Sequence, residues 1–172
     1  MSSVPDPRLE ALLLRTGIDA FNTDYAEKLD RKDLAAWVDC FAEDAFYTVI
    51  SRENFERNHP VGLIYCEGRA MIADRAFALL KTAMFGPRYL RHMLSNLSIV
   101  LEADGTVRAR ANFIVFEVLM DRPEPRVLLI GEYRDVFVRD GDTLKLKERR
   151  CVYDNLLIPT ALCSPVYRGA NG

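Results

Sequence analysis

The sequence predicts an α+β fold, in which N-terminal helices pack on a strongly curved, mainly antiparallel sheet. In the first half of the 172-residue chain, apolar residues recur at three- and four-residue spacing, as on one side of a helix. From Met93 onward they recur at every second residue, as in strands. Long strands with one buried face twist and curl around the helices that cover them. We therefore expect a single cone-shaped domain over residues 1–172, with an ordered core at 8–165.

Three helices are expected in the first half. Asp6 can cap the first helix, and Pro7 suits its first turn because proline lacks an amide hydrogen. The second helix begins at Asp30 or Asp33, and its apolar stripe includes aromatic side chains that are expected in the core. The third is expected over residues 71–84.

Four long strands are expected in the second half, near residues 90–102, 106–119, 127–139 and 143–154. Two of their connections contain Asp-Gly, a strong hairpin signal, so consecutive strands should pair antiparallel. Two shorter strands are expected at Ala45–Ser51 and Gly62–Cys66, between the second and third helices.

The composition argues against several classes of function. The net charge is -2 and the isoelectric point is 5.8, without the basic run that a nucleic-acid-binding surface needs. The N-terminus lacks a charged region followed by an apolar stretch, and no apolar run approaches the ~20 residues that span a bilayer. Four scattered cysteines without a close pair are expected to be buried, reduced thiols. We expect a cytoplasmic protein.

The metal-binding residues are too few for an iron centre. A Rieske cluster needs two cysteines and two histidines in closely spaced motifs. The chain has only His59 and His92, neither close to a cysteine at the required spacing. Nucleotide-binding motifs are also missing from the sequence, so no cofactor is expected in this chain.

A cone-shaped domain can enclose a pocket for acid–base chemistry, and the sequence offers four candidate groups for it. They are His92, Asp44, Tyr47 and Asp154. The competing interpretation is that His92 is a hydrogen-bonded structural residue and that Asp44 belongs to a turn or cap.

Charged residues within the strands have two different interpretations. Five alternating charges are expected on solvated sheet faces: Arg108, Arg110, Lys145, Lys147 and Arg149. By contrast, Glu132, Arg134 and Asp135 interrupt a strand rich in valine, leucine and isoleucine. Such groups persist when they are paired or face another subunit.

The segment after the last strand is apolar in a way that a free tail would not be. It contains Leu156, Leu157 and Ile158. Together with the charged strand Glu132–Asp135, these residues are the candidate subunit interface.

Residues 25–53 resemble the opening of the small (β) subunits of aromatic-ring-hydroxylating dioxygenases. That family carries Leu-Asp, then Trp, then Phe-x-x-Asp-x-x-Tyr, then Arg-Glu-Asn. The chain has, in the same order, Leu29-Asp30, Trp37, Phe41, Asp44, Tyr47 and Arg52-Glu53-Asn54. The later matches are Tyr65, Met71, Asp74-Arg75, Arg91-His92, Ser95-Asn96, Gly131, Tyr133-Arg134-Asp135, Arg149-Arg150 and Asp154. The resemblance spans residues 15–165.

The resemblance implies a fold like nuclear transport factor 2 (NTF2), ketosteroid isomerase and scytalone dehydratase. It implies assembly with a large α subunit that carries a Rieske 2Fe-2S cluster and a mononuclear iron, commonly as α3β3. Electrons would come from NAD(P)H through a reductase, and the β subunit would be chiefly structural. The substrate would be an aromatic acid such as benzoate, salicylate or anthranilate, with polycyclic hydrocarbons left open.

Two alternatives share this fold. One is a stand-alone isomerase or dehydratase that uses His92 and Asp44, and the other is a small-ligand-binding protein. They would need an open interior lined by these groups, whereas a structural subunit would have an interior filled by Trp37, Phe41 and their neighbours.

Overall fold

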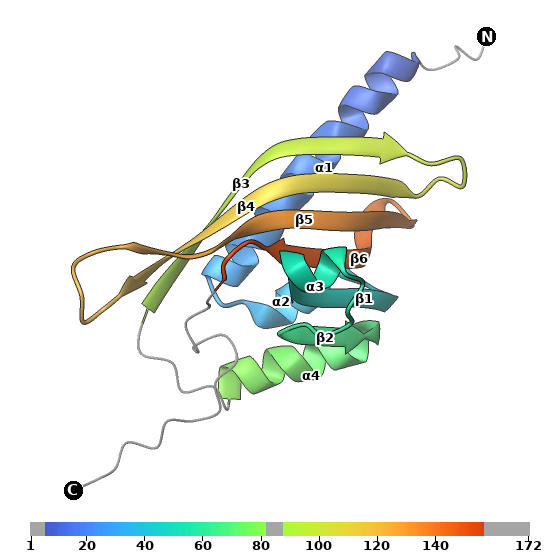
Figure 1. The fold of residues 1–172 in the computed structure, drawn as a ribbon. Coiled ribbons are helices and arrows are strands. Elements are labelled where there is room, and N and C mark those ends of the chain that lie inside the picture. The colour runs from blue at the N-terminus through green and yellow to red at the C-terminus, as the bar shows by residue number, and fades with distance from the viewer. Residues whose placement is uncertain (1–5, 82–87, 157–172) are drawn as a thin grey trace, which may run out of the picture.

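The computed structural model describes residues 6–81 and 88–156 (Figure 1). In chain order the elements are α1 (Pro7–Asp30), α2 (Leu34–Val38), β1 (Phe41–Ser51), α3 (Arg52–Glu56), β2 (Ile64–Glu67), α4 (Gly68–Lys81), β3 (Arg88–Leu101), β4 (Val107–Leu119), β5 (Arg126–Asp140) and β6 (Thr143–Tyr153). The α+β class is confirmed, and each of the four long strands lies within two residues of its expected bounds.

The strands form one six-stranded sheet in the order β2-β1-β6-β5-β4-β3. The four long strands pair antiparallel with their chain neighbours, as the hairpin signals predict. β1 joins the sheet through a parallel pairing with β6 and an antiparallel pairing with β2. The sheet is therefore mainly antiparallel, and its two edges are β2 and β3.

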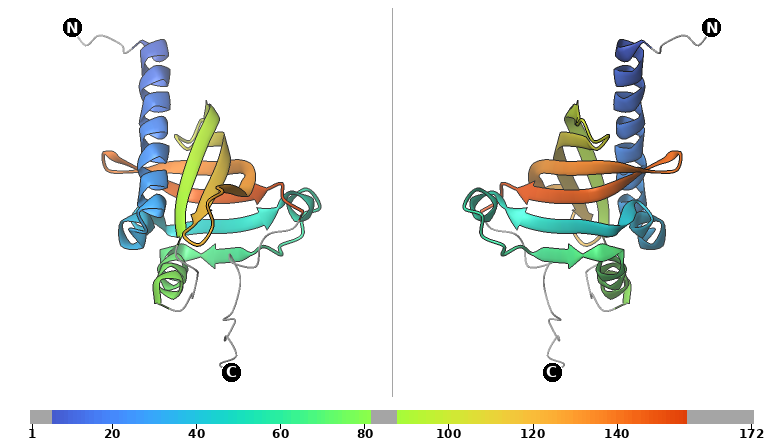
Figure 2. Two further views of the ribbon diagram at one scale, coloured as in Figure 1. Left: turned by 90° about the vertical axis from the view of Figure 1, so that its left-hand side faces the viewer. Right: turned by 90° about the vertical axis from the view of Figure 1, so that its right-hand side faces the viewer.

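Helices cover the sheet on one face, which we call the inner face. α1 packs against β3, and α4 packs against β1 and α2. Figures 1 and 2 show α1, α2 and α4 on this side, with the short α3 on the opposite side, which we call the outer face. None of the helices in the described ranges has the length and apolarity that crossing a bilayer would need.

The expected helix starts are met with one exception. Asp6 caps α1 by accepting a hydrogen bond from the Arg8 amide at 2.9 Å, and Asp33, not Asp30, caps α2. α4 begins at Gly68, three residues before its expected start, and its expected end at Met84 lies outside the described residues. The five-residue α3 was not predicted, because it is too short to show a helical repeat.

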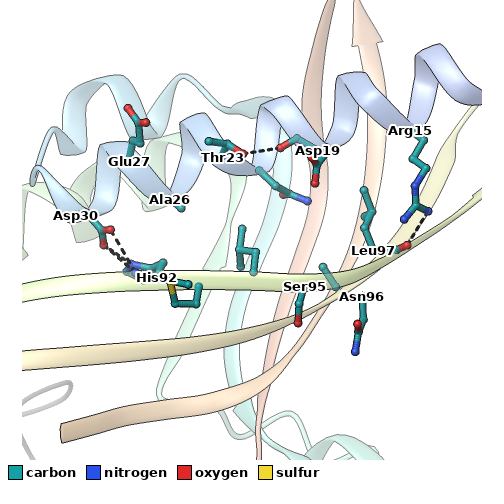
Figure 3. A pocket seen from close by; sticks show the side chains of 14 residues that line it. Arg15, Asp19, Thr23, Ala26, Glu27, Asp30, His92, Ser95, Asn96 and Leu97 are labelled. Carbon is teal, nitrogen blue, oxygen red and sulfur yellow. Dashed lines mark hydrogen bonds and ion pairs between the residues drawn. The ribbon is translucent and has the colours of Figure 1, made fainter. Parts of the chain in front are cut away.

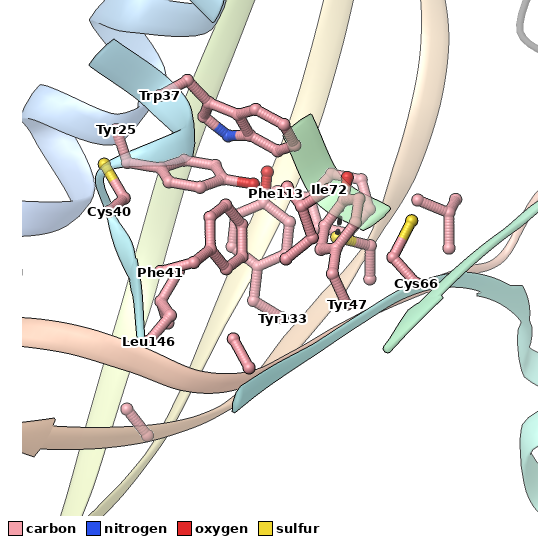
Figure 4. Close-up of a cluster of buried hydrophobic side chains, with 14 of the residues drawn as sticks. Tyr25, Trp37, Cys40, Phe41, Tyr47, Cys66, Ile72, Phe113, Tyr133 and Leu146 are labelled. Carbon is pink, nitrogen blue, oxygen red and sulfur yellow. Dashed lines mark hydrogen bonds between the residues drawn. The ribbon is translucent and has the colours of Figure 1, made fainter. Parts of the chain in front are cut away.

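An aromatic cluster fills the space between the inner face and the helices (Figure 4). The Trp37 ring meets Phe41 and Tyr47 edge-to-face, at centroid distances of 5.0 and 5.5 Å. Phe41 is fully buried and Trp37 nearly so. Aromatic pairs of this geometry stabilise by about 0.5–1.5 kcal/mol each beyond the burial of their apolar area. The part of the interior around Trp37 and Phe41 is therefore a packed core.

Gly131 on β5 marks a position where no side chain fits. A Cβ atom there would lie 2.1 Å from the Val152 carbonyl oxygen and 2.9 Å from Cζ of Phe113. The glycine allows the β5 and β6 backbones and the Phe113 ring to approach this closely. Packing against the neighbouring strands explains why glycine stands at this point of the strand.

A bulge in β6 corrects one expectation from the sequence. Phe137 on β5 pairs with Leu146, whereas the preceding Val136 pairs with Glu148, so Lys147 is an extra residue in β6. The bulge shifts the alternation of side chains, and both Leu146 and Arg149 point inward with no exposed surface. The expectation that Arg149 lies on a solvated sheet face is therefore wrong.

Candidate functional site

Arg149 is the centre of a buried polar network on the inner face. Its guanidinium donates to both carboxylate oxygens of Asp135, from Nε at 2.9 Å and from Nη2 at 2.7 Å. Nη2 also donates to Oδ1 of Asn22 on α1, at 2.7 Å. The guanidinium lies between two rings, with Cζ 4.1 Å from the centroid of Tyr25 and 4.3 Å from that of Tyr133. Planar stacking and a bidentate carboxylate are the contacts that arginine makes better than lysine.

The electrostatics of this network fix its charge state. Burial lowers the pKa of Arg149, but the negative charge of Asp135 raises it further, so the pKa lies well above the ordinary value. Burial raises the pKa of Asp135, while the charge and hydrogen bonds of Arg149 oppose this. Arg149 therefore stays protonated, and its Nε and Nη2 donate to Asp135 and Asn22. Its Nη1 is buried and has no hydrogen-bond partner among the described residues. The network ties α1 to β5 and β6 and offers no free base for catalysis.

His92 lies in a groove between α1 and β3 (Figure 3). The groove has a volume of about 460 Å³. The Asp30 carboxylate, at the end of α1, lies 2.6 Å from Nδ1 of His92 and accepts from the His92 backbone amide at 3.2 Å. The contact of one ring nitrogen with a nearly buried carboxylate fixes the orientation of the imidazole. Asp30 and His92 thus anchor the end of α1 to an edge strand.

The other three acid–base candidates lie in separate contacts. Asp44 is exposed and bonded to Lys147, which lowers its pKa. Tyr47 is buried beside the Cys151 thiol, and burial raises its pKa well above the ordinary value. Asp154 accepts from Nε of Arg52 at 2.7 Å. None of these contacts involves His92, so the geometry provides no shared acid–base site for the four groups.

Metal-binding geometry is equally lacking in the part of the chain that the structure describes. There, no group of three or more His, Cys, Asp or Glu side chains could hold a metal ion. His59 is exposed in the loop after α3, whereas His92 is bonded to Asp30 on the other side of the sheet. Burial raises the pKa of the Cys151 thiol to about 12, so this cysteine is a protonated core residue at neutral pH. These residues do not fit an iron centre.

The proposed interface residues have different positions. Glu132 and Arg134 lie on the outer face, where Nε of Arg134 donates to Glu132 at 2.7 Å. Leu156 is 98% exposed, and Leu157 and Ile158 lie outside the described residues. Asp135 is instead buried within the chain and paired with Arg149, so the expectation that it lies in an intersubunit contact needs correction. The alternation of the strand explains this, since Asp135 points inward between two outward-facing neighbours.

An apolar row crosses the outer face and was not predicted from the sequence. Met93 on β3 pairs with Ile114 on β4, and Ile114 pairs with Ile130 on β5. Met93 is 58% exposed and Ile130 is 42% exposed, although both lie in the middle of long strands. The signal for it was the nearly continuous apolar run of residues 113–119, which is typical of a strand that is covered on both faces. Contiguous exposed apolar side chains in the middle of a sheet are typical of protein-interaction surfaces.

Comparison with known proteins places this geometry in a family. The family model of the ring hydroxylating beta subunit matches residues 25–160. The small subunit of anthranilate 1,2-dioxygenase from Burkholderia cepacia is 32% identical over 142 residues, which cover 83% of this chain and 88% of that subunit. The terminal oxygenase component subunit beta 2 of terephthalate 1,2-dioxygenase from Comamonas sp is 29% identical, over 87% of this chain and 96% of that subunit.

Comparison with solved structures indicates the same family. A crystal structure from Novosphingobium aromaticivorans, of a protein assigned as the beta subunit of an aromatic-ring-hydroxylating dioxygenase, matches with a TM-score of 0.79 and 37% identity. The match covers 91% of this chain and 99% of that one. The family model, the curated relatives and the solved structure agree with one another. The chain belongs to the family of ring-hydroxylating dioxygenase β subunits.

Proposed function

We propose that this chain is the structural β subunit of an aromatic-ring-hydroxylating dioxygenase and assembles with a large α subunit that performs the chemistry. The α subunit would carry the Rieske 2Fe-2S cluster and the mononuclear iron, and electrons would reach it from NAD(P)H through a reductase. The β subunits would form a trimer within an α3β3 hexamer. The cytoplasmic location expected from the sequence is part of this proposal.

The observation that carries the proposal is the contrast between a filled interior and an apolar outer face. Trp37, Phe41 and Tyr47 belong to the buried cluster that fills the space between the sheet and α2. The apolar row Met93–Ile114–Ile130 is exposed on the opposite side of the sheet. Stable subunit interfaces have an apolar centre and bury more than about 2,000 Å². The row supplies such a centre.

Glu132, Arg134 and Leu156 are proposed as the polar and C-terminal parts of the same interface. Glu132 and Arg134 lie on the outer face beside the apolar row. Asn155 donates to the Leu128 carbonyl oxygen and accepts from the Ile130 amide, which holds Leu156 close to β5. A partner that covers the apolar row would therefore meet these residues too.

The substrate of the complex is proposed to be an aromatic acid. Two relatives are named for anthranilate and terephthalate, which are both aromatic carboxylates. Benzoate and salicylate belong to the same chemical class. Since the interior of this chain is packed, discrimination among these acids is assigned to the α subunit.

The mass of the chain in solution tests the proposal. We expect light scattering of the chain mixed with its large subunit to give the mass of a hexamer with equal numbers of both chains. Met93→Lys, which places a charge in the apolar row, should weaken this complex and leave the fold of the isolated chain intact. A chain that stays monomeric and ignores the large subunit would contradict the proposal.

A further inference from the structure

A second row crosses the outer face and consists of arginines. Arg110 on β4 pairs with Arg134 on β5, and Arg134 pairs with Arg150 on β6. We call Arg110, Arg134 and Arg150 the arginine row. Like charges directly opposite one another in a sheet are destabilising, so three in one line need a compensating neighbour.

The chain itself compensates the row only in part. Arg134 and Arg150 bind the in-strand Glu132 and Glu148, each through Nε. Their terminal nitrogens have no further acceptor among the described residues. Arg110 makes no ion pair within the described ranges. The row thus keeps one uncompensated charge and several donors, arranged for carboxylates that come from outside the chain.

A hollow with aromatic walls adjoins the row at Arg150. Its volume is about 290 Å³, and Phe46, Phe55 and Tyr65 line it together with Arg150. The Arg150 guanidinium lies 5.1 Å from the Phe46 ring centroid, and that of Arg134 lies 4.7 Å from Phe55. The two arginines are therefore held against rings, and their charged ends are positioned in advance of binding.

The arginine row and the apolar row belong to one surface. Arg110 and Ile114 are four residues apart on β4, which is about 13 Å along a strand. Between them lies the pair Asn112 and Glu132. A single partner that covers the apolar row would reach the arginines at its polar margin.

We propose, on the basis of the function proposed above, that the arginine row binds an acidic segment of the large subunit. The segment carries at least two carboxylates for the row and an apolar or aromatic side chain that enters the hollow. A small aromatic acid has too few carboxylates for three arginines spread over three strands. A second copy of the same face is a poorer fit, because a direct overlay of the two rows would bring arginines against arginines.

Charge reversal tests the proposal. The double variant R110E/R134E in the full chain is titrated with the large subunit, at low and at high salt, and compared with the wild type. We expect the affinity to fall by about tenfold or more. Salt should weaken the wild-type complex, because it screens the attraction between the arginines and the carboxylates of the partner. It should not weaken the complex of the variant, because there it screens a repulsion. The double variant R110K/R134K keeps the charge but loses the bidentate geometry of arginine. Its affinity for the large subunit should lie between those of the wild type and R110E/R134E.

Arg139→Glu is the matched control, because Arg139 is an exposed arginine of the same strand outside the row. It should bind as the wild type does. Circular dichroism and the urea midpoint check the fold of each variant, and R110Q/R134Q replaces the reversal if that chain does not fold.

Three results would overturn the inference. One is an unchanged affinity of R110E/R134E for the large subunit. Another is a loss of self-association of the isolated variant, which would assign the row to contacts between copies. The third is saturable binding of anthranilate that Arg150→Gln abolishes, which would make the hollow a small-molecule site. Failure of the wild type to bind any large subunit would instead overturn the proposed function itself.

Discussion

Arg149 and Arg150 are neighbours in the sequence and have opposite environments. Arg149 points inward, has no exposed surface, and is held by Asp135, Asn22 and two tyrosine rings. Arg150 points outward, is 40% exposed, and binds Glu148 on its own strand. The same chemical group is thus part of the core on one face and part of the proposed binding surface on the other. In this proposal, the inner face stabilises the fold and the outer face binds the large subunit.

The largest effect is expected from breaking the inner pair. Arg149→Met leaves the Asp135 carboxylate buried without its partner, which should cost about 3–5 kcal/mol of unfolding free energy. Urea unfolding of the isolated chain measures this. Asp135→Leu added to Arg149→Met should recover most of the loss, because replacing both partners by apolar groups is often neutral. A single variant as stable as the wild type would show that the pair is not essential to the core.

A similar loss of unfolding free energy is expected when an aromatic core residue is truncated. An apolar residue of the outer face serves as the comparison. Phe41→Ala removes a fully buried ring and should cost about 3–5 kcal/mol. Met93→Ala removes an exposed side chain of the apolar row, so the isolated chain should change by less than about 0.5 kcal/mol. Urea midpoints compare the two. Equal losses would mean that the apolar row is already covered within a single chain.

An intermediate effect that depends on pH is expected at Glu117. This buried carboxylate on β4 accepts from Arg88 at 2.7 Å and from Arg126 at 2.5 Å. Burial raises its pKa, but the two arginines lower it further, so the net pKa lies below the ordinary value.

A carboxyl with a lowered pKa in the folded state stabilises the protein above its unfolded pKa, and this contribution is lost as the pH falls through the folded pKa. Glu117→Gln should therefore cost about 1.5–3 kcal/mol at neutral pH and much less in acid. Urea unfolding curves of the wild type and of Glu117→Gln, measured from neutral to acidic pH, test this prediction. A difference that does not change with pH would mean that packing, not charge, explains the loss.

The smallest effect on stability is expected at the exposed arginine. Arg150→Gln removes a solvent-exposed ion pair, which contributes at most about 1 kcal/mol and often nothing measurable. Thermal unfolding should thus hardly change, while binding of the large subunit weakens. A large loss of stability would place Arg150 with the core residues and would remove the distinction from Arg149.

The sequence predicted the parts of the fold that depend on local signals. The cap at Asp6, the Asp-Gly turns and the two-residue alternation located α1 and the four long strands. The metal-poor composition and the family motifs gave the functional class.

The sequence did not predict features that depend on register. The extra residue Lys147 in β6 reverses the alternation and buries Arg149, and no local signal marks it. Asp135 was recognised as unusual within its strand, but only the pairing of β5 with β6 shows that its partner is Arg149. The arginine row is likewise invisible in the sequence, because its members lie on three strands.

The distribution of iron between the subunits tests the central claim most directly. The complex isolated with this chain is separated into its subunits, and each is assayed for iron, acid-labile sulfide and turnover of an aromatic acid. We expect all iron and sulfide in the large subunit and no turnover by this chain alone. Stoichiometric iron retained by the separated chain, or oxidation of an arene without a partner, would contradict the account.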